Sequence, residues 1–174
     1  MKKNILLLVS LLFCTYSFAQ ELSKKTLATT DIKTLDMQTI SSDELGNDGN
    51  PFIVSFWATW CKPCIKELNT IAEVYEDWQE ETGVKLIAIS IDDSRSMSKV
   101  KPFVNGNDWD FEVYLDPNSD FRRAMSVNMV PHTFLFNGNR EMVDQHTSFS
   151  PGDEDELFEK VKLVKAGKSL KKEQ

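Results

Sequence analysis

The sequence predicts an α/β fold with a central mixed sheet flanked by helices, and two strand pairs carry that prediction. Apolar runs over 52–57 and 84–91 are separated by a stretch of helical periodicity, which is typical of buried parallel strands joined by a helix. Further along, an Asn-Gly pair between 133–136 and 141–146 predicts a two-residue hairpin with antiparallel strands. Parallel and antiparallel pairs in one domain make the sheet mixed.

The helix between the first two strands is expected to run unbroken over 61–82. Its apolar residues recur at helical spacing and form one stripe, and Gly83 supplies the end of the helix. A right-handed strand–helix–strand unit places its site beyond the carboxyl end of a strand, which is where Cys61 stands.

Local signals predict the remaining elements. They are a helix over 96–105 that Pro102 delays or kinks, a strand over 111–115, a short helix over 119–125 and a final helix over 153–166. The final helix begins with acidic residues and ends with lysines, an order that complements the helix dipole. We interpret the lysines that continue to Lys172 as a solvated end, with a basic docking tail as the alternative.

The first residues are typical of a secretory signal peptide. Lys2 and Lys3 precede an apolar stretch over 5–13 that is too short to span a bilayer, and small residues follow it. We expect cleavage after Ala19 and an exported, soluble product. The alternative is a lipoprotein anchored through Cys14, although the bulky residue before that cysteine argues against it.

The rest of the chain is expected to divide at residue 50. Residues 20–50 are polar and predict a flexible lead followed by a short hairpin or edge strand, and 51–174 form the main domain. The chain carries 20 Lys and Arg against 27 Asp and Glu, a net charge of −7. An acidic surface repels nucleic acid and anionic lipid, which argues against both as partners.

The cysteines predict redox chemistry. If Cys14 leaves with the signal peptide, Cys61 and Cys64 are the two that remain. A disulfide between Cys61 and Cys64 would close a very short loop, and closing a short loop adds little to the stability of the fold. In an oxidising compartment such an isolated close pair of cysteines is therefore more often catalytic than structural. Cys61 lies nearest the helix start, where the dipole favours a thiolate, and Cys64 lies about one turn inside. We therefore expect Cys61 to attack and Cys64 to complete the exchange.

The stretch over 55–64, Ser-Phe-Trp-Ala-Thr-Trp-Cys-Lys-Pro-Cys, resembles the active-site signature of thioredoxin-fold thiol-disulfide oxidoreductases. With Val-Pro-His-Thr-Phe-Leu over 130–135 and the leader, the chain is most similar to the exported TlpA/ResA type. The resemblance implies a thioredoxin-like fold, an enzyme that reduces protein disulfides without a cofactor or a metal, and a periplasmic or cell-envelope location. It also implies disulfide-bearing clients, with apocytochrome c in cytochrome c maturation as one class, and a membrane electron donor.

The resemblance also implies roles around the cysteines. Pro131 is expected to follow a cis peptide bond, so that the backbone of Val130 is open to a client strand and metal ions are kept away. Trp60 offers an apolar rim for the client. Lys62 and Pro63 lie between the cysteines, where a cation and a helix-starting proline adjust the redox potential.

Proton transfer needs a separate group. Ser55 stands where thioredoxin has a buried Asp, and serine is no base near neutral pH. Glu67 matches a glutamate to which the ResA type assigns proton handling, and it neighbours Cys64 on the helix. The alternative is an ordinary exposed glutamate.

Other interpretations of the cysteine pair stay open. A zinc site needs about four ligands, and only His132 and His146 could join the two thiolates. A copper-binding or copper-delivery module would use Cys61, Cys64 and His132 as ligands for Cu(I), although a cis-proline against the thiols argues against it. A peroxidase is weaker still, because the motif around a peroxiredoxin cysteine is not found.

Overall fold

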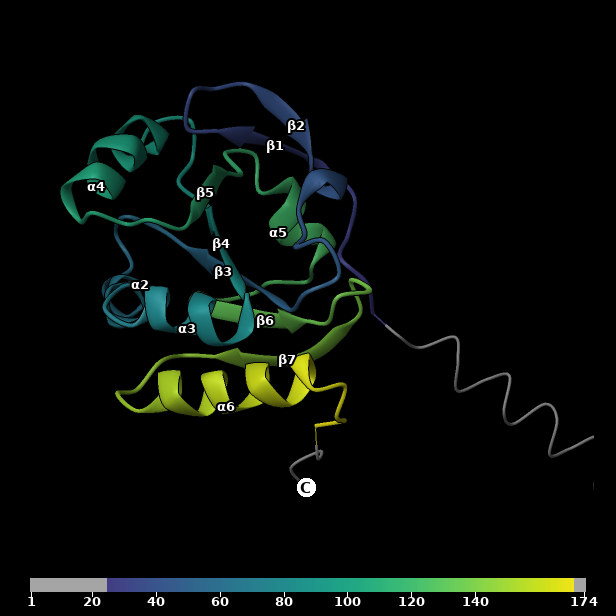
Figure 1. Ribbon diagram of the computed structural model, residues 1–174. Coiled ribbons are helices and arrows are strands. Elements are labelled where there is room, and N and C mark those ends of the chain that lie inside the picture. Colours follow the sequence, from purple (N-terminus) through teal and green to yellow (C-terminus); the bar gives the residue numbers. More distant parts are fainter. Residues whose placement is uncertain (1–24, 171–174) are drawn as a thin grey trace, which may run out of the picture.

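A seven-stranded mixed sheet runs through the computed structural model, which describes residues 25–170 (Figure 1). The strands lie in the order β2-β1-β5-β4-β3-β6-β7. They are β1 (Asp31–Thr34), β2 (Thr39–Ser41), β3 (Phe52–Trp57), β4 (Lys85–Ser90), β5 (Glu112–Leu115), β6 (His132–Phe136) and β7 (Met142–Thr147). The signal peptide expected over 1–19 lies outside the described residues.

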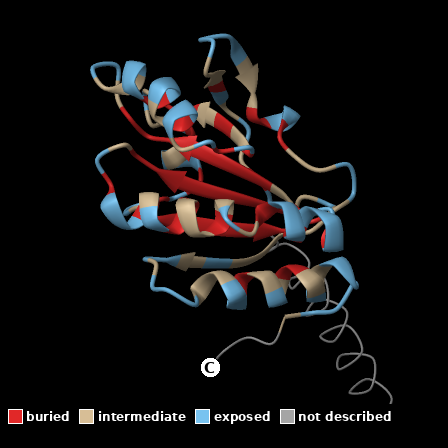
Figure 2. Cartoon of the chain, turned by 60° about the vertical axis from the view of Figure 1, so that its left-hand side comes forward, coloured by how far each residue is buried: buried red, intermediate tan, exposed pale blue. Residues whose placement is uncertain are grey.

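β3 is a central strand, and all of its residues are buried (Figure 2). It pairs in parallel with β4 and antiparallel with β6, and β4 pairs in parallel with β5. Its apolar and aromatic residues suit a strand that is covered on both faces. The α/β fold with a mixed sheet is therefore confirmed.

Helices cover both faces of this sheet. They are α2 (Lys62–Ala72), α3 (Tyr75–Thr82), α4 (Val100–Gly106), α5 (Asp120–Ala124) and α6 (Asp153–Lys165), with 3-10 turns η1 (Ser42–Glu44) and η2 (Met97–Lys99). Phe56 packs on Phe121 of α5, while the next residue, Trp57, packs on Phe103 of α4. Since successive strand residues point to opposite faces, α4 and α5 lie on opposite sides. None of the helices within residues 25–170 is long and apolar enough to cross a membrane.

The expectation of one unbroken helix over 61–82 is wrong. Val74 leaves helical geometry, with φ −121° and ψ 4°, and separates α2 from α3. A β-branched residue is a weak helix former, and after the break the hydroxyl of Tyr75 accepts the N–H of Leu86 at 3.0 Å. Gly83 does end α3, in the left-handed conformation with φ 69°.

The two-residue hairpin predicted at Asn137-Gly138 is also wrong. The N–H of Asn137 donates to the carbonyl of Glu141 at 3.0 Å, and β7 begins only at Met142, so the loop is longer. Gly138 serves a close approach instead, because a Cβ there would lie 1.9 Å from the carbonyl oxygen of Gly49. A contact between distant loops therefore shapes this turn.

The N-terminal extension forms part of the sheet. β1 and β2 make the expected hairpin, and β1 pairs antiparallel with β5. Before the hairpin, Thr26 forms an isolated bridge with Glu141, and the carbonyl of Lys25 accepts the N–H of Met142 at 2.8 Å. Leu27 is buried in the main core, so the extension is packed against the sheet.

Candidate active site

Cys61 and Cys64 follow the carboxyl end of β3 and are joined by a disulfide. Cys61 is the N-cap of α2, and its sulfur accepts the backbone N–H of Cys64 at 3.3 Å. Cys61 is 5% exposed and Cys64 is 0% exposed, so Cys61 is the sulfur nearer to solvent although both are enclosed. The helix start supplies N–H donors and the positive end of the dipole, which favour a thiolate at Cys61 after reduction.

A buried aspartate braces the loop that precedes the cysteines. Asp92, just beyond β4, accepts the backbone N–H of Thr59 at 2.8 Å and its hydroxyl at 2.6 Å. The hydroxyl of Ser90 donates to the same carboxylate at 2.9 Å. Three donors compensate the desolvation of a buried carboxylate, so the cysteine loop is held to the neighbouring strand.

The Val130–Pro131 peptide bond is cis and leads into β6. Because β6 runs antiparallel to β3, it begins at the edge of the sheet where β3 ends. Met129 on this loop is 57% exposed, and Trp60 on the cysteine loop is 64% exposed. Each loop therefore carries a large apolar side chain in solvent.

The residues between the cysteines begin the helix. Pro63 lies in the first turn of α2, where its missing N–H removes no helical hydrogen bond. Lys62 precedes it with an exposed side chain, directly after the N-cap Cys61. A proline and a cation thus occupy the first turn of the helix.

A chain of buried polar groups connects β3 to α2. Ser55 of β3 and Thr133 of β6 are paired residues, and their hydroxyl oxygens are 2.9 Å apart. The Thr133 hydroxyl also lies 2.7 Å from Oε1 of Glu67 on α2. An ionised carboxylate only accepts hydrogen bonds, so Thr133 donates to Glu67 and accepts from Ser55. Glu67 is 1% exposed and is not a surface residue of the helix.

Glu67 has a further partner on β7. His146 pairs with Thr133 across β6 and β7 and places Nε2 at 3.2 Å from the same Oε1 atom. The other oxygen, Oε2, is buried and has no hydrogen-bond partner among residues 25–170. Glu67 and Cys64 are three residues apart and both buried on α2, so a carboxyl group lies about one helical turn from the inner cysteine.

His132 is placed on the other face of the sheet. Its ring stacks on that of Phe134, with centroids 4.2 Å apart, while Thr133 between them points towards Glu67. Burial lowers the pKa of His132 and so favours the neutral ring. In the described part of the chain, no group of three His, Cys, Asp or Glu side chains could hold a metal ion.

The model of the AhpC/TSA family matches residues 23–145 of this sequence. The chain belongs to the AhpC/TSA family. A solved thioredoxin-like protein from Porphyromonas gingivalis is 47% identical, with a TM-score of 0.72 over 80% of this chain and 92% of that one. The thioredoxin-like fold is therefore confirmed.

Two curated relatives of this AhpC/TSA family member are named for thiol chemistry. Thiol-disulfide oxidoreductase ResA of Bacillus cereus is 34% identical over 97 residues, which cover 56% of this chain and 54% of that protein. Sporulation thiol-disulfide oxidoreductase A of Bacillus subtilis is 29% identical over 126 residues, or 71% of this chain and 74% of that one. The chain thus spans about half the length of the ResA relatives it matches.

Four residues around this AhpC/TSA site were missed as functional candidates in the sequence. Asp92 and Met129 lie in no recognised motif, Thr133 lies within Val-Pro-His-Thr-Phe-Leu over 130–135 but received no role of its own, and His146 was considered only as a zinc ligand. The one available signal was the strand pairing, because a register that sets Thr133 opposite His146 also turns both side chains to the face of Glu67.

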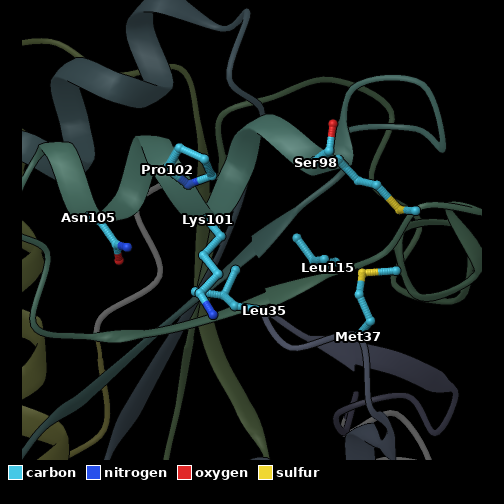
Figure 3. Close-up of a pocket in the computed structure, with 8 residues that line it drawn as sticks. Leu35, Met37, Ser98, Lys101, Pro102, Asn105 and Leu115 are labelled. Carbon is cyan, nitrogen blue, oxygen red and sulfur yellow. The ribbon is translucent and has the colours of Figure 1, made fainter.

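This AhpC/TSA family member also has a cavity of about 650 Å³ between the β1–β2 turn and α4 (Figure 3). Apolar side chains such as Leu35, Met37 and Pro102 line it, together with Lys101. Neither cysteine nor any member of the Glu67 chain lines it, so it is separate from the redox pair.

Proposed function

We propose that the chain is an exported thiol-disulfide oxidoreductase that reduces disulfides in client proteins. The observation that supports this most is the Cys61–Cys64 disulfide at the start of α2, with the more exposed sulfur at the N-cap. The names of the ResA and sporulation relatives support the same reaction.

The reaction has two exchange steps. In the reduced enzyme the Cys61 thiolate attacks a client disulfide, a bond forms between Cys61 and one client sulfur, and the other client sulfur leaves as a thiolate. Cys64 then attacks the sulfur of Cys61, which forms the intramolecular disulfide and releases the second client thiolate. The client gains two electrons and the enzyme loses two.

Cys64 must lose its proton before the second step. Glu67 is the proposed acceptor, because its carboxyl group is buried about one helical turn from the inner cysteine and its Oε2 atom is not engaged by any described residue. General base catalysis of this kind contributes about 10²- to 10⁴-fold in rate.

The exposed rim is proposed to bind the client. The backbone of Val130 before Pro131 would pair with an extended client segment, and Trp60 would cover its apolar side chains. Lys62 and Pro63 would raise the fraction of thiolate at Cys61 through charge and through the helix start, an effect that salt weakens.

Export and partners complete the proposal. Lys2, Lys3 and the apolar stretch over 5–13 support secretion to the periplasm or cell envelope with cleavage after Ala19. Mass spectrometry of the product from the native compartment tests this, since retention of the leader or a lipid on Cys14 would contradict it. Clients would include apocytochrome c, and a membrane electron donor would return the enzyme to its reduced state.

The direct test is reduction of insulin by the purified chain with excess dithiothreitol. We expect Cys61→Ser in the mature chain to abolish the activity. An active Cys61→Ser variant would refute the role of Cys61. Expression of Cys64→Ser in the native compartment should then trap clients on Cys61 as mixed disulfides.

A further inference from the structure

We propose that His146 is the proton exit of this site. It takes the proton that Glu67 removes from Cys64 and passes it to water between β7 and α6. The inference rests on the proposed thiol-disulfide exchange and deepens it, because the cysteines and Glu67 alone give the buried proton no way out.

The first observation is the enclosure of Glu67. Its Oε1 atom has two partners, the Thr133 hydroxyl at 2.7 Å and Nε2 of His146 at 3.2 Å. Thr133 is 1% exposed, and the next group in that direction, Ser55, is 0% exposed. His146 has a side chain that is 26% exposed, so this ring is the partner of Glu67 that reaches solvent.

The second observation is a pocket that the ring of His146 lines. A pocket of about 140 Å³ lies between β7 and α6, which is room for several waters at roughly 30 Å³ each. Its lining comprises His146, Thr147, Asp153, Glu156, Leu157 and Lys160. A ring that contacts a buried carboxyl group and also lines a polar pocket can join the two.

Acidic side chains surround the ring of His146. Glu67 faces it from α2, and Asp153 and Glu156 share the pocket with it from α6. The cation of the pocket, Lys160, is paired with Glu156 at 2.6 Å and with Asp144 of β7 at 2.9 Å. Carboxylates therefore outnumber ammonium groups on the path that the proton takes.

The proton balance follows the second exchange step. The Cys64 thiol gives its proton to Glu67, the bond between Cys64 and Cys61 forms, and the bond from Cys61 to the client sulfur breaks. The client sulfur leaves as a thiolate and takes a proton from solvent. Before the Cys64 thiolate attacks, Glu67 returns to the carboxylate as its proton moves to Nε2 of His146 and the ring releases a proton to pocket water, so the proton cannot return from Glu67 to Cys64.

Histidine suits this position because imidazole exchanges protons with water near neutral pH. Glutamine could keep a hydrogen bond to Oε1 of Glu67 but cannot carry a proton. The comparison of these two side chains therefore separates proton transfer from support of the structure.

The experiment follows the reduced full chain as it reacts with DTNB, a small aromatic disulfide that releases a coloured thiolate. Attack by Cys61 releases the first thiolate, and attack by Cys64 on the resulting mixed disulfide releases the second. At pH 7 we expect His146→Gln and His146→Ala to slow the second phase about tenfold or more and to leave the first unchanged. A second phase at the wild-type rate in His146→Gln would overturn the proposal.

Chemical rescue of the second phase by an added base distinguishes proton transfer by His146 from a structural role of its side chain. His146→Ala enlarges a pocket that is open to solvent, so added imidazole should restore the second phase, and more so as pH rises and more of it is neutral. Pyrazole, which has the same shape but is a far weaker base, should not. Equal restoration by both compounds, or by neither, would overturn the proposal.

Two controls complete the design. His132→Ala removes the histidine on the other face of the sheet, and its second phase should not respond to imidazole. In a Glu67→Gln background, His146→Ala should cause no further loss, because the proton no longer arrives. A wild-type chain that shows no reaction at Cys61 would refute the proposed function. Wild-type phases whose rates do not change in the His146 variants would refute this inference alone.

Discussion

Replacement of Thr133 by valine should destabilise the protein through its buried polar chain. The hydroxyl of Thr133 lies 2.7 Å from Oε1 of Glu67 and 2.9 Å from the hydroxyl of Ser55, and valine removes both contacts while it keeps the shape. A buried polar group that loses its partner costs roughly 1–3 kcal/mol. The Ser55 hydroxyl loses its partner and Oε1 of Glu67 keeps only Nε2 of His146, so we expect the free energy of unfolding to fall by about 2–4 kcal/mol and the melting temperature by roughly 5–15 °C.

Urea denaturation of the oxidised chain measures this change, and Thr133→Ser is the matched control. Serine keeps the hydroxyl and loses one methyl group, so its destabilisation should stay near 1 kcal/mol. Ser55→Ala added to Thr133→Val should cost less than the sum of the single variants, because the second change removes a group that the first had stranded. A loss below about 0.5 kcal/mol in Thr133→Val, or equal losses in both variants, would refute the reasoning.

Three further predictions concern the loops and the second histidine. Gly138→Ala should lower the free energy of unfolding by about 2–3 kcal/mol because its Cβ would clash with the carbonyl of Gly49, whereas Gly106→Ala, with nothing within 4 Å, should not destabilise the fold; thermal melts decide. Burial lowers the pKa of His132 in the folded protein, so the neutral ring contributes fully to stability above the ordinary pKa of about 6.5, and this contribution is lost as the pH falls towards the lower folded pKa. The free energy of unfolding in urea should therefore depend less on pH between about pH 7 and 5 in His132→Gln than in the wild type. An unchanged pH dependence would contradict this. Met129→Ala should raise KM for a protein client roughly tenfold without changing the DTNB rate, because about 1.5 kcal/mol of apolar contact is lost, whereas Met37→Ala on the β1–β2 turn should change neither; equal effects would contradict a client-binding rim.

Elements of the fold could be predicted from the sequence where a short stretch of residues determines its own structure. Five apolar residues over 52–57 specify a buried strand, and Gly83 specifies a helix end because its left-handed backbone disfavours other residues. The spacing of the two cysteines likewise predicted that the redox site lies at the start of the helix after this strand. These signals need no knowledge of what lies across the sheet.

The rest depends on contacts between distant parts of the chain. The break at Val74 coincides with the contact of Tyr75 with β4, and the longer β6–β7 loop accompanies the packing of Gly138 against Gly49. Neither contact has a local signature.

The environment of Glu67 shows the same limit at the site. Its partners, Thr133 and His146, lie 66 and 79 residues away, and they meet it because β6 and β7 pair in one register. A shift of one residue would turn both side chains to the opposite face. Helical spacing alone therefore left the burial of Glu67 open.

The bridge between Thr26 and Glu141 determines where the N-terminal extension lies relative to the cysteines. Glu141 precedes β7, at the end of the sheet where β6 finishes, and the cysteines follow β3 at the opposite end. The N-terminal extension therefore joins the sheet at the end remote from the sulfurs, which leaves the cysteine end of the sheet uncovered by it.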